Sequence, residues 1–258
     1  MSGARRLEGI GVVITRPEAA AEALAAPLAA EGAKVWLLPA LAIQDVAPTP
    51  ALASLLADLA RFDMAIFVSA NAVEKGLAAA RRHGAWPEGL RVAAVGEATA
   101  QALRSSGIAQ VISPSERHDS EALLALAQLQ VVKGQNIVVF RGEGGREHLK
   151  EVLEARGAKV AYAECYARVR PRGDASAVLA ALARGEVHAV SALSAETLEN
   201  FMAMIGPDGA RHLESVTLVV PHEAVGGHRE ARRFARVAIA SHGAEGLIEA
   251  LTPLRVGS

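Results

Sequence analysis

Six short segments of this 258-residue chain lead from an apolar run directly into a helix-like run, and they are rich in small and hydroxyl residues. Segments of this kind leave the first amides of a helix unpaired, with the positive end of the helix dipole behind them. Such amides bind carboxylates and phosphates, so the sequence predicts receptors for an anion. The segments are TRPEA (15–19), SANAV (69–73), VGEATA (95–100), RGEGGRE (141–147), SAETL (194–198) and PHEAV (221–225).

The most glycine-rich of these segments, residues 141–147, could be a nucleotide-binding loop. The dinucleotide fingerprint, counted from Gly142, requires a third glycine where this chain has Glu147. A P-loop requires lysine and then serine or threonine after its last glycine, and this chain has Arg146 and Glu147 there. Both motifs fail, so the sequence favours an anion other than a nucleotide phosphate.

Most of these residues also have a plain structural interpretation. Ser69, Thr99 and Ser194 could simply cap helices, which is the commoner role of such residues. The glycines of segment 141–147 could do no more than relieve a tight turn. Tyr166 could pack in a core or, in a cleft, act as a weak general acid. The residues by themselves leave these alternatives open.

Other catalytic patterns are sparse. The eight histidines are scattered and show no metal-ligand spacing, so we expect no metal site. No G-x-S-x-G elbow occurs. The single cysteine, Cys165, excludes a disulfide within the chain, and a lone strand cysteine is more often a small apolar residue than a nucleophile.

The composition excludes several classes of protein. Lysine and arginine number 27 against 28 acidic residues, a balance that argues against a general nucleic-acid or membrane-surface binder. No apolar run approaches the roughly 18 residues of a membrane span, and the first ten residues lack the apolar core of a signal peptide. We therefore expect a cytoplasmic protein.

Ten short apolar runs alternate with helix-like stretches rich in alanine and leucine. Most runs are continuously apolar, which is typical of strands covered on both faces, and interleaved helices favour parallel βαβ units. The sequence thus predicts an α/β protein. The predicted strands are 11–15, 34–39, 64–69, 91–96, 109–113, 136–142, 159–166, 188–194, 216–221 and 236–241.

The strongest internal feature is a repeat with an offset of 125 residues. Residues 12–35 align with 137–160 without a gap, and this places Arg16 on Arg141. The same offset places Ser69 on Ser194. One register that holds across five predicted strands indicates two copies of one α/β half. The arginine that recurs after a strand in both copies is a candidate for the mouth of a binding cleft.

Over approximately residues 9–252, the chain resembles the uroporphyrinogen-III synthase family. Each motif is weak alone, and the resemblance rests on their order and spacing. In order they are TRP (15–17), SANAV (69–73), VGEATA (95–100), DSEALLALA (119–127), RGEGGRE (141–147) and ECYARV (164–169).

The resemblance implies two similar doubly wound parallel-sheet (flavodoxin-like) domains joined by a two-segment extended linker. Domain 1 would be discontinuous and comprise residues 1–38 and 173–258, and the inserted domain 2 would comprise 43–166. The linker segments would be 39–42 and 167–172.

The resemblance also implies a reaction. The family cyclises the linear tetrapyrrole hydroxymethylbilane to uroporphyrinogen III, with loss of water and inversion of the terminal pyrrole ring, and uses no cofactor. The carboxylates of the substrate would bind the helix-start amides of both domains, and arginines would lie at the rim of the site.

Carried over residue by residue, the family's tyrosine proposed to assist departure of the hydroxyl corresponds to Tyr166. His222 lies where a small hydroxyl residue is usual in the family, so this turn departs from the pattern. The expected substrate-binding residues are Arg16, Ser69, Ala70, Asn71, Thr99, Arg141, Gly142, Gly144, Gly145, Ser194, Ala195 and His222.

Two other functions stay open at this point. One is a non-catalytic module that binds a tetrapyrrole or another polyanion, and the other is a nucleotide-using transferase, which the missing phosphate motifs disfavour. For the enzyme we expect a small-molecule substrate, a hand-over from the bilane-forming enzyme, no nucleic-acid or membrane partner, and a monomer.

Overall fold

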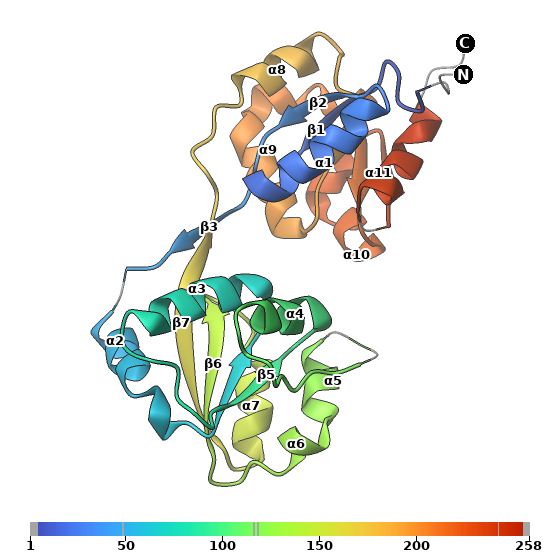
Figure 1. Cartoon of the computed structure of the whole chain (residues 1–258). Helices are drawn as coiled ribbons and strands as arrows, with labels where there is room; N and C mark the ends of the chain where they lie inside the picture. Colours follow the sequence, from blue (N-terminus) through green and yellow to red (C-terminus); the bar gives the residue numbers. More distant parts are fainter. Residues whose placement is uncertain (1–4, 48, 116, 118, 242, 255–258) are drawn as a thin grey trace. The chain divides into compact units, whose positions relative to one another are not determined.

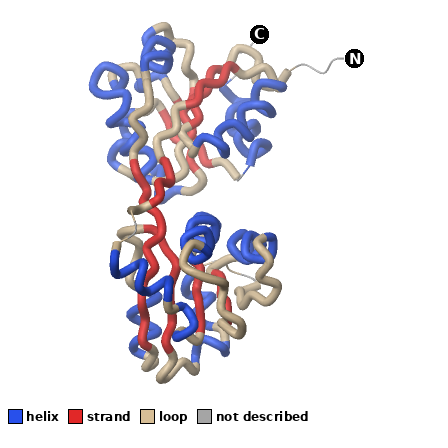
Figure 2. The backbone as a smooth tube through the Cα atoms, turned by 60° about the vertical axis from the view of Figure 1, so that its left-hand side comes forward, coloured by secondary structure: helices blue, strands red, loops and turns tan. Residues whose placement is uncertain are grey.

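The computed structural model describes residues 5–254 except 48, 116, 118 and 242. The chain divides into two compact units. Unit 1 comprises Met1–Ala42 and Val169–Ser258, and unit 2 comprises Ile43–Arg168. Each unit is built around one five-stranded sheet with helices on both of its faces (Figures 1 and 2).

The sheet of unit 1 has the strand order β10-β9-β8-β1-β2, and its strands pair in parallel. This is the order of a doubly wound sheet, in which the chain winds outward from β1 in both directions. The strands are β1 (Gly11–Ile14), β2 (Lys34–Leu37), β8 (Ala189–Ser191), β9 (Thr217–Val220) and β10 (Arg236–Ile239). The helices are α1 (Glu18–Ala30), α8 (Ser176–Ala183), α9 (Ala195–Ala210), α10 (Glu223–Gly226) and α11 (Gly243–Leu251).

Unit 1 buries both faces of its sheet, which explains why its strands are continuously apolar. Val13 packs in a core with residues of α8 and α9, such as Phe201. Its neighbours Val12 and Ile14 point the other way and pack with α1 and α11. Alternate residues of one strand therefore belong to two separate cores.

The sheet of unit 2 has the order β3-β7-β6-β4-β5. Its strands are β3 (Ala42–Asp45), β4 (Met64–Phe67), β5 (Arg91–Ala94), β6 (Asn136–Gly142) and β7 (Lys159–Val169). Its helices are α2 (Pro50–Ala57), α3 (Ala70–Arg81), α4 (Glu97–Ser105), α5 (Ser120–Ala125), α6 (Ala127–Gln130) and α7 (His148–Ala155). Short 3₁₀ helices lie at Leu59–Arg61, Leu213–Ser215, Arg229–Arg233 and Thr252–Leu254.

Strands that the 125-residue repeat aligns occupy equivalent places in the two sheets. β6, β7, β4 and β5 take the places in unit 2 that β1, β2, β8 and β9 take in unit 1. The place of β10 is taken only by Ile112, which forms an isolated bridge with Ala93. The strand predicted at 109–113 is therefore wrong. Pro114, which follows directly, has no amide hydrogen to extend the pairing and restricts the residue before it.

None of the helices among the described residues is long and apolar enough to cross a membrane.

A stacked aromatic pair lies at the centre of one core of unit 2. The rings of Phe67 and Phe140 are 4.5 Å apart and nearly parallel. Both side chains are fully buried, and a Cβ atom at Gly76 of α3 would lie only 2.6 Å from the Phe140 ring. The close approach of α3 to the sheet therefore depends on a glycine at this position.

We predict that Phe140→Ala lowers the free energy of unfolding by about 3–5 kcal/mol, because it removes the stacked ring and leaves a cavity. Urea denaturation followed by circular dichroism measures this loss. Val131→Ala is the matched control, since Val131 is 78% exposed and its truncation should change stability by less than about 0.5 kcal/mol. Similar losses in the two variants would contradict the assignment of Phe140 to the core.

Candidate functional site

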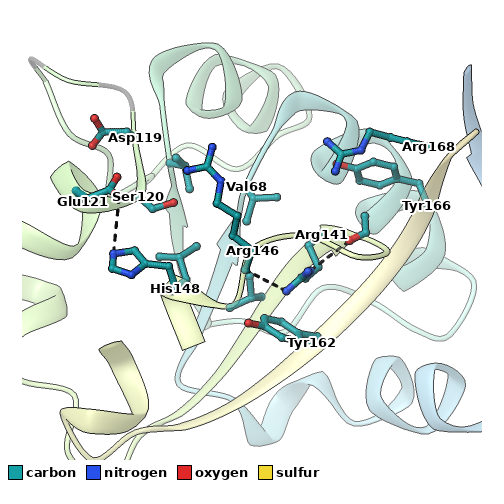
Figure 3. Close-up of a pocket in the computed structure, with 15 residues that line it drawn as sticks. Val68, Asp119, Ser120, Glu121, Arg141, Arg146, His148, Tyr162, Tyr166 and Arg168 are labelled. Carbon is teal, nitrogen blue, oxygen red and sulfur yellow. Dashed lines mark hydrogen bonds and ion pairs between the residues drawn. The ribbon is translucent and has the colours of Figure 1, made fainter. Parts of the chain in front are cut away.

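The carboxyl ends of β4, β5 and β6 meet at one edge of the sheet of unit 2, because these strands are parallel. A pocket of about 340 Å³ lies at this edge, as expected for ligand sites in open parallel sheets (Figure 3). Val68, Val95, Val139 and Leu149 form its apolar part. Its polar side chains are Asp119, Ser120, Glu121, Arg141, Arg146, His148, Tyr162, Tyr166 and Arg168.

The glycine turn, residues 142–147, connects β6 to α7 along this pocket. Gly144 has a φ of 66°, in the left-handed region that favours glycine. The amide of Glu143 donates to the carbonyl of Tyr166 at 2.9 Å. The amides of residues 144–147 make no hydrogen bond to any residue that the structure describes. The turn therefore presents unused donors, as the sequence predicts.

Arg141 lies beneath this turn rather than at its rim. Its side chain is 4% exposed, and its Nε donates to the carbonyl of Gly142 at 3.2 Å. Its Nη1 donates to the carbonyl of Arg146 at 3.3 Å and pairs with the Glu147 carboxylate at 3.0 Å. That Arg141 binds substrate stays a prediction, and in this structure its guanidinium has protein partners.

Tyr166 lines the pocket from β7, and its ring is 5% exposed. The register between β6 and β7 shifts at the end of the pair, so Gly142 lies opposite Tyr166 and not opposite Cys165. A Cβ atom at Gly142 would lie 2.6 Å from the Tyr166 ring, so this glycine is required by the close approach. The register shift leaves one extra residue in β7, as a β-bulge does, and such features re-aim side chains near sites.

The Tyr166 hydroxyl lies 3.0 Å from the hydroxyl oxygen of Ser69. Ser69 is also the N-cap of α3 and accepts the amide hydrogen of Ala72 at 3.1 Å. The capping interpretation of Ser69 is therefore confirmed, and the same oxygen contacts Tyr166. Ala70 and Asn71 follow as the exposed first residues of α3.

Thr99 is buried, at 5% exposed, in the first turn of α4. The cap position of this helix is taken by Gly96, so the interpretation of Thr99 as a helix cap is wrong. Cys165 is also buried, and burial raises the pKa of its thiol to about 12, so it is not a thiolate nucleophile at neutral pH.

Several pocket residues were missed by the sequence analysis. Tyr162 stacks on the Arg141 guanidinium, with 4.2 Å between the guanidinium carbon and the ring centroid. Burial, followed by the nearby Glu147 carboxylate, raises the pKa of Tyr162 to about 12. Its only sequence signal is that it is one of just two tyrosines in the chain.

Arg146, His148 and Arg168 also line the pocket. Arg146 lies within the predicted anion segment, and Arg168 lies within a predicted linker segment. The ring of His148 points toward Glu121, with 3.8 Å between Nε2 and the carboxylate oxygen (Figure 3). The Arg146 side chain extends away from Arg141, on the Ser120 side of the pocket (Figure 3). The pocket thus combines three arginines, two carboxylates and two phenols, and the glycine turn beside them has free amides.

The carboxyl edge of the sheet of unit 1 holds the remaining predicted residues. Ser194 caps α9, accepts the amide hydrogen of Thr197 at 3.1 Å, and lies 2.9 Å from the Thr197 hydroxyl. Ala195 is the first residue of this helix. His222 is exposed at the start of the four-residue α10, and its side chain makes no capping hydrogen bond.

Arg16 lies at the same edge of unit 1 and is half-buried. Its Nε atom is buried and has no hydrogen-bond partner among the described residues. Burial lowers the pKa of the guanidinium. Arg16 lines a cavity of about 10 Å³, the size of one water molecule, together with Ser191, Pro221 and Ser241.

Among the described residues, no group of three or more histidine, cysteine, aspartate and glutamate side chains is placed to hold a metal ion.

Comparison with known proteins gives consistent matches. A family model described as "Uroporphyrinogen-III synthase HemD" matches residues 22–249. The uroporphyrinogen-III synthase of Salmonella typhimurium is 40% identical over 160 residues, which are 62% of this chain and 65% of that protein. The Escherichia coli protein of the same name is 32% identical over 199 residues, or 76% and 80% of the two chains. The Synechococcus elongatus protein is 31% identical over 221 residues, or 82% of each chain.

Solved structures agree in fold. A mutant uroporphyrinogen III synthase from Thermus thermophilus superposes with a TM-score of 0.63 at 17% identity, covering 95% of this chain and 98% of its own. The uroporphyrinogen-III synthetase of Helicobacter pylori superposes with a TM-score of 0.61 at 14% identity, covering 95% and 100%. Both confirm the two-domain α/β fold that the resemblance implies. The family model matches residues 22–249, which are most of this chain, so the chain belongs to the uroporphyrinogen-III synthase family.

Proposed function

We propose that this chain cyclises hydroxymethylbilane to uroporphyrinogen III and that the pocket of unit 2 performs the step that releases water. The observation that carries this assignment is the Tyr166 hydroxyl, which lies in a cationic pocket 3.0 Å from the Ser69 hydroxyl. Anion binding and proton donation therefore come together at one edge of one sheet.

The glycine turn supports binding of a carboxylate side arm. Its amides at 144–147 are unused, whereas the carbonyls of Gly142 and Arg146 already accept hydrogen bonds from Arg141. A turn with its acceptors satisfied and its donors free attracts an anion and not a cation. The Arg146 guanidinium forms no ion pair with any residue that the structure describes, and it adds a charge-assisted donor to this site.

Tyr166 would donate the proton that the departing hydroxyl needs. The Ser69 oxygen accepts the Ala72 amide hydrogen, so its own hydrogen can point to the Tyr166 oxygen. The phenol hydrogen of Tyr166 is then directed to the substrate. As the carbon–oxygen bond of the hydroxymethyl group breaks, the oxygen leaves with the electron pair, takes this proton and departs as water.

Arg16 would bind a substrate carboxylate at the edge of unit 1. Its buried Nε has no partner, and burial disfavours a charge that lacks a counter-ion. A bound carboxylate supplies that counter-ion. Ser191 and Ser241 beside it provide a polar surround.

The assay for the reaction supplies porphobilinogen and a bilane-forming enzyme, oxidises the products, and resolves the porphyrin isomers. We predict that type III predominates when this chain is present, because ring closure occurs on the enzyme with inversion of the last ring. Type I alone, as in the reaction without the chain, would contradict the enzyme and favour a non-catalytic tetrapyrrole-binding module.

We predict that Tyr166→Phe lowers kcat by about 10- to 100-fold and changes KM by less than about twofold, because general acid catalysis acts in the transition state. Steady-state rates of type III formation measure both constants. Unfolding curves of the variant verify that the fold is retained. An unchanged rate and isomer yield would show that the phenol is dispensable.

We predict that Arg16→Met raises KM about tenfold, since a charge-assisted hydrogen bond contributes about 1.5–3 kcal/mol. The matched control is Arg211→Met, because Arg211 is exposed at the far end of α9 from Ser194. Equal KM values for the two variants would remove Arg16 from the binding site.

A further inference from the structure

We propose that Arg141 is a positioning residue, which holds the glycine turn 142–147 in the shape that presents its amides and Arg146 to the substrate. The inference rests on the proposed function, because it assigns the residue that prepares the same carboxylate receptor. It changes the role that the sequence suggests for Arg141, from contact with the ligand to support of the residues that make this contact.

The contacts of Arg141 run along the whole turn. Nε binds the carbonyl at the start of the turn, on Gly142, and Nη1 binds the carbonyl near its end, on Arg146. Both carbonyls are thereby drawn toward the guanidinium. The peptide units that follow leave the amides of residues 144–147 without a described partner. The Arg141 side chain therefore uses two carbonyl acceptors of the turn and leaves the amide donors of residues 144–147 free.

The surroundings of Arg141 hold the guanidinium in place. Tyr162 stacks on it at 4.2 Å, Glu147 pairs with it at 3.0 Å, and Glu164 lies 3.6 Å from Nε. A Cβ atom at Gly145 would lie 2.6 Å from Nη2, so the turn closes over the guanidinium only with glycine at this position. The buried position of Arg141 therefore requires a glycine at residue 145.

The repeat supplies an internal comparison. Arg16 occupies the same register in unit 1, but the segment after it reads PEAAAE and contains no glycine. Its Nε atom has no hydrogen-bond partner among the described residues, and it lines a cavity. At the same position of the repeat, Arg16 has an Nε without a partner and is followed by no glycine turn. Arg141 is followed by a glycine turn and has its hydrogen-bond partners within that turn.

The test is a double-mutant cycle on KM in the type III assay, using Arg141→Met, Arg146→Met and the double variant. Arg146→Met should raise KM about tenfold in the wild-type background and less than about threefold in the Arg141→Met background. This non-additivity is expected because Arg146 binds substrate well only when Arg141 holds the turn. The kcat values should stay within about threefold, because binding to the turn is lost equally in the ground and transition states.

A merely structural role gives a different result. In that case Arg141→Met would lower the unfolding midpoint but leave KM unchanged, and the two substitutions would act additively. Either observation overturns the proposal.

Because Arg141→Met could prevent unit 2 from folding, Gly145→Ala provides a second route. It keeps the charge but adds a methyl group against the guanidinium, and it should also raise KM. Gly227→Ala is the control, because its added Cβ would meet only a carbonyl oxygen at 3.5 Å and it lies outside the turn. Equal KM values for the two alanine variants would contradict the proposal.

Failure of the proposed function is a separate outcome. It appears as the absence of type III product with the wild-type chain, whereas failure of the positioning role leaves the wild-type reaction and the effect of Tyr166→Phe intact.

Discussion

Burial of the Arg141 charge constrains the whole carboxyl edge of unit 2. A guanidinium taken out of water has to be matched by acceptors and by opposite charge. This chain supplies two carbonyls of the turn that follows, the Glu147 carboxylate and the face of the Tyr162 ring. Turning those carbonyls inward determines where the amides of the turn point. The acceptors of the turn thus satisfy one buried cation, and its amides are left as donors for the proposed ligand.

The second constraint is the extra residue in β7. Ala161, Ala163 and Cys165 face the core beneath α2, α3 and α4, as alternation requires, and Tyr166 joins the same core directly after Cys165. Without the bulge, Tyr166 would share the face of Tyr162, which packs against the core of α5, α6 and α7. The bulge therefore brings the phenol to Ser69 at the start of α3.

This geometry separates what the sequence could predict from what it could not. Continuous apolar runs and the repeat located nine of the ten strands but not β3, because β3 is short and only partly buried. The turns after the strands located the pocket, because their place follows from parallel pairing. The direction of the Arg141 side chain depends on contacts with Tyr162 and Glu164, more than twenty residues away. The register shift in β7 is seen only in its pairing with β6, which lies more than twenty residues earlier in the chain. The bridge at Ile112 shows the reverse case, in which a predicted strand pairs at a single residue and Pro114, shortly after it, has no amide hydrogen to extend the pairing.

The two halves of the repeat keep the same caps but not the same chemistry. Ser69 and Ser194 each accept an amide hydrogen from the residue three positions later, Ala72 in unit 2 and Thr197 in unit 1. In unit 1 the second contact of the serine is the Thr197 hydroxyl, within the same helix turn. In unit 2 the residue at the position of Thr197 is Ala72, which has no hydroxyl. There the serine contacts the hydroxyl of Tyr166, a residue that aligns with Leu41 of unit 1 in the repeat. The same helix cap therefore contacts a hydroxyl of its own helix turn in unit 1 and the hydroxyl of a distant strand residue, the proposed proton donor Tyr166, in unit 2.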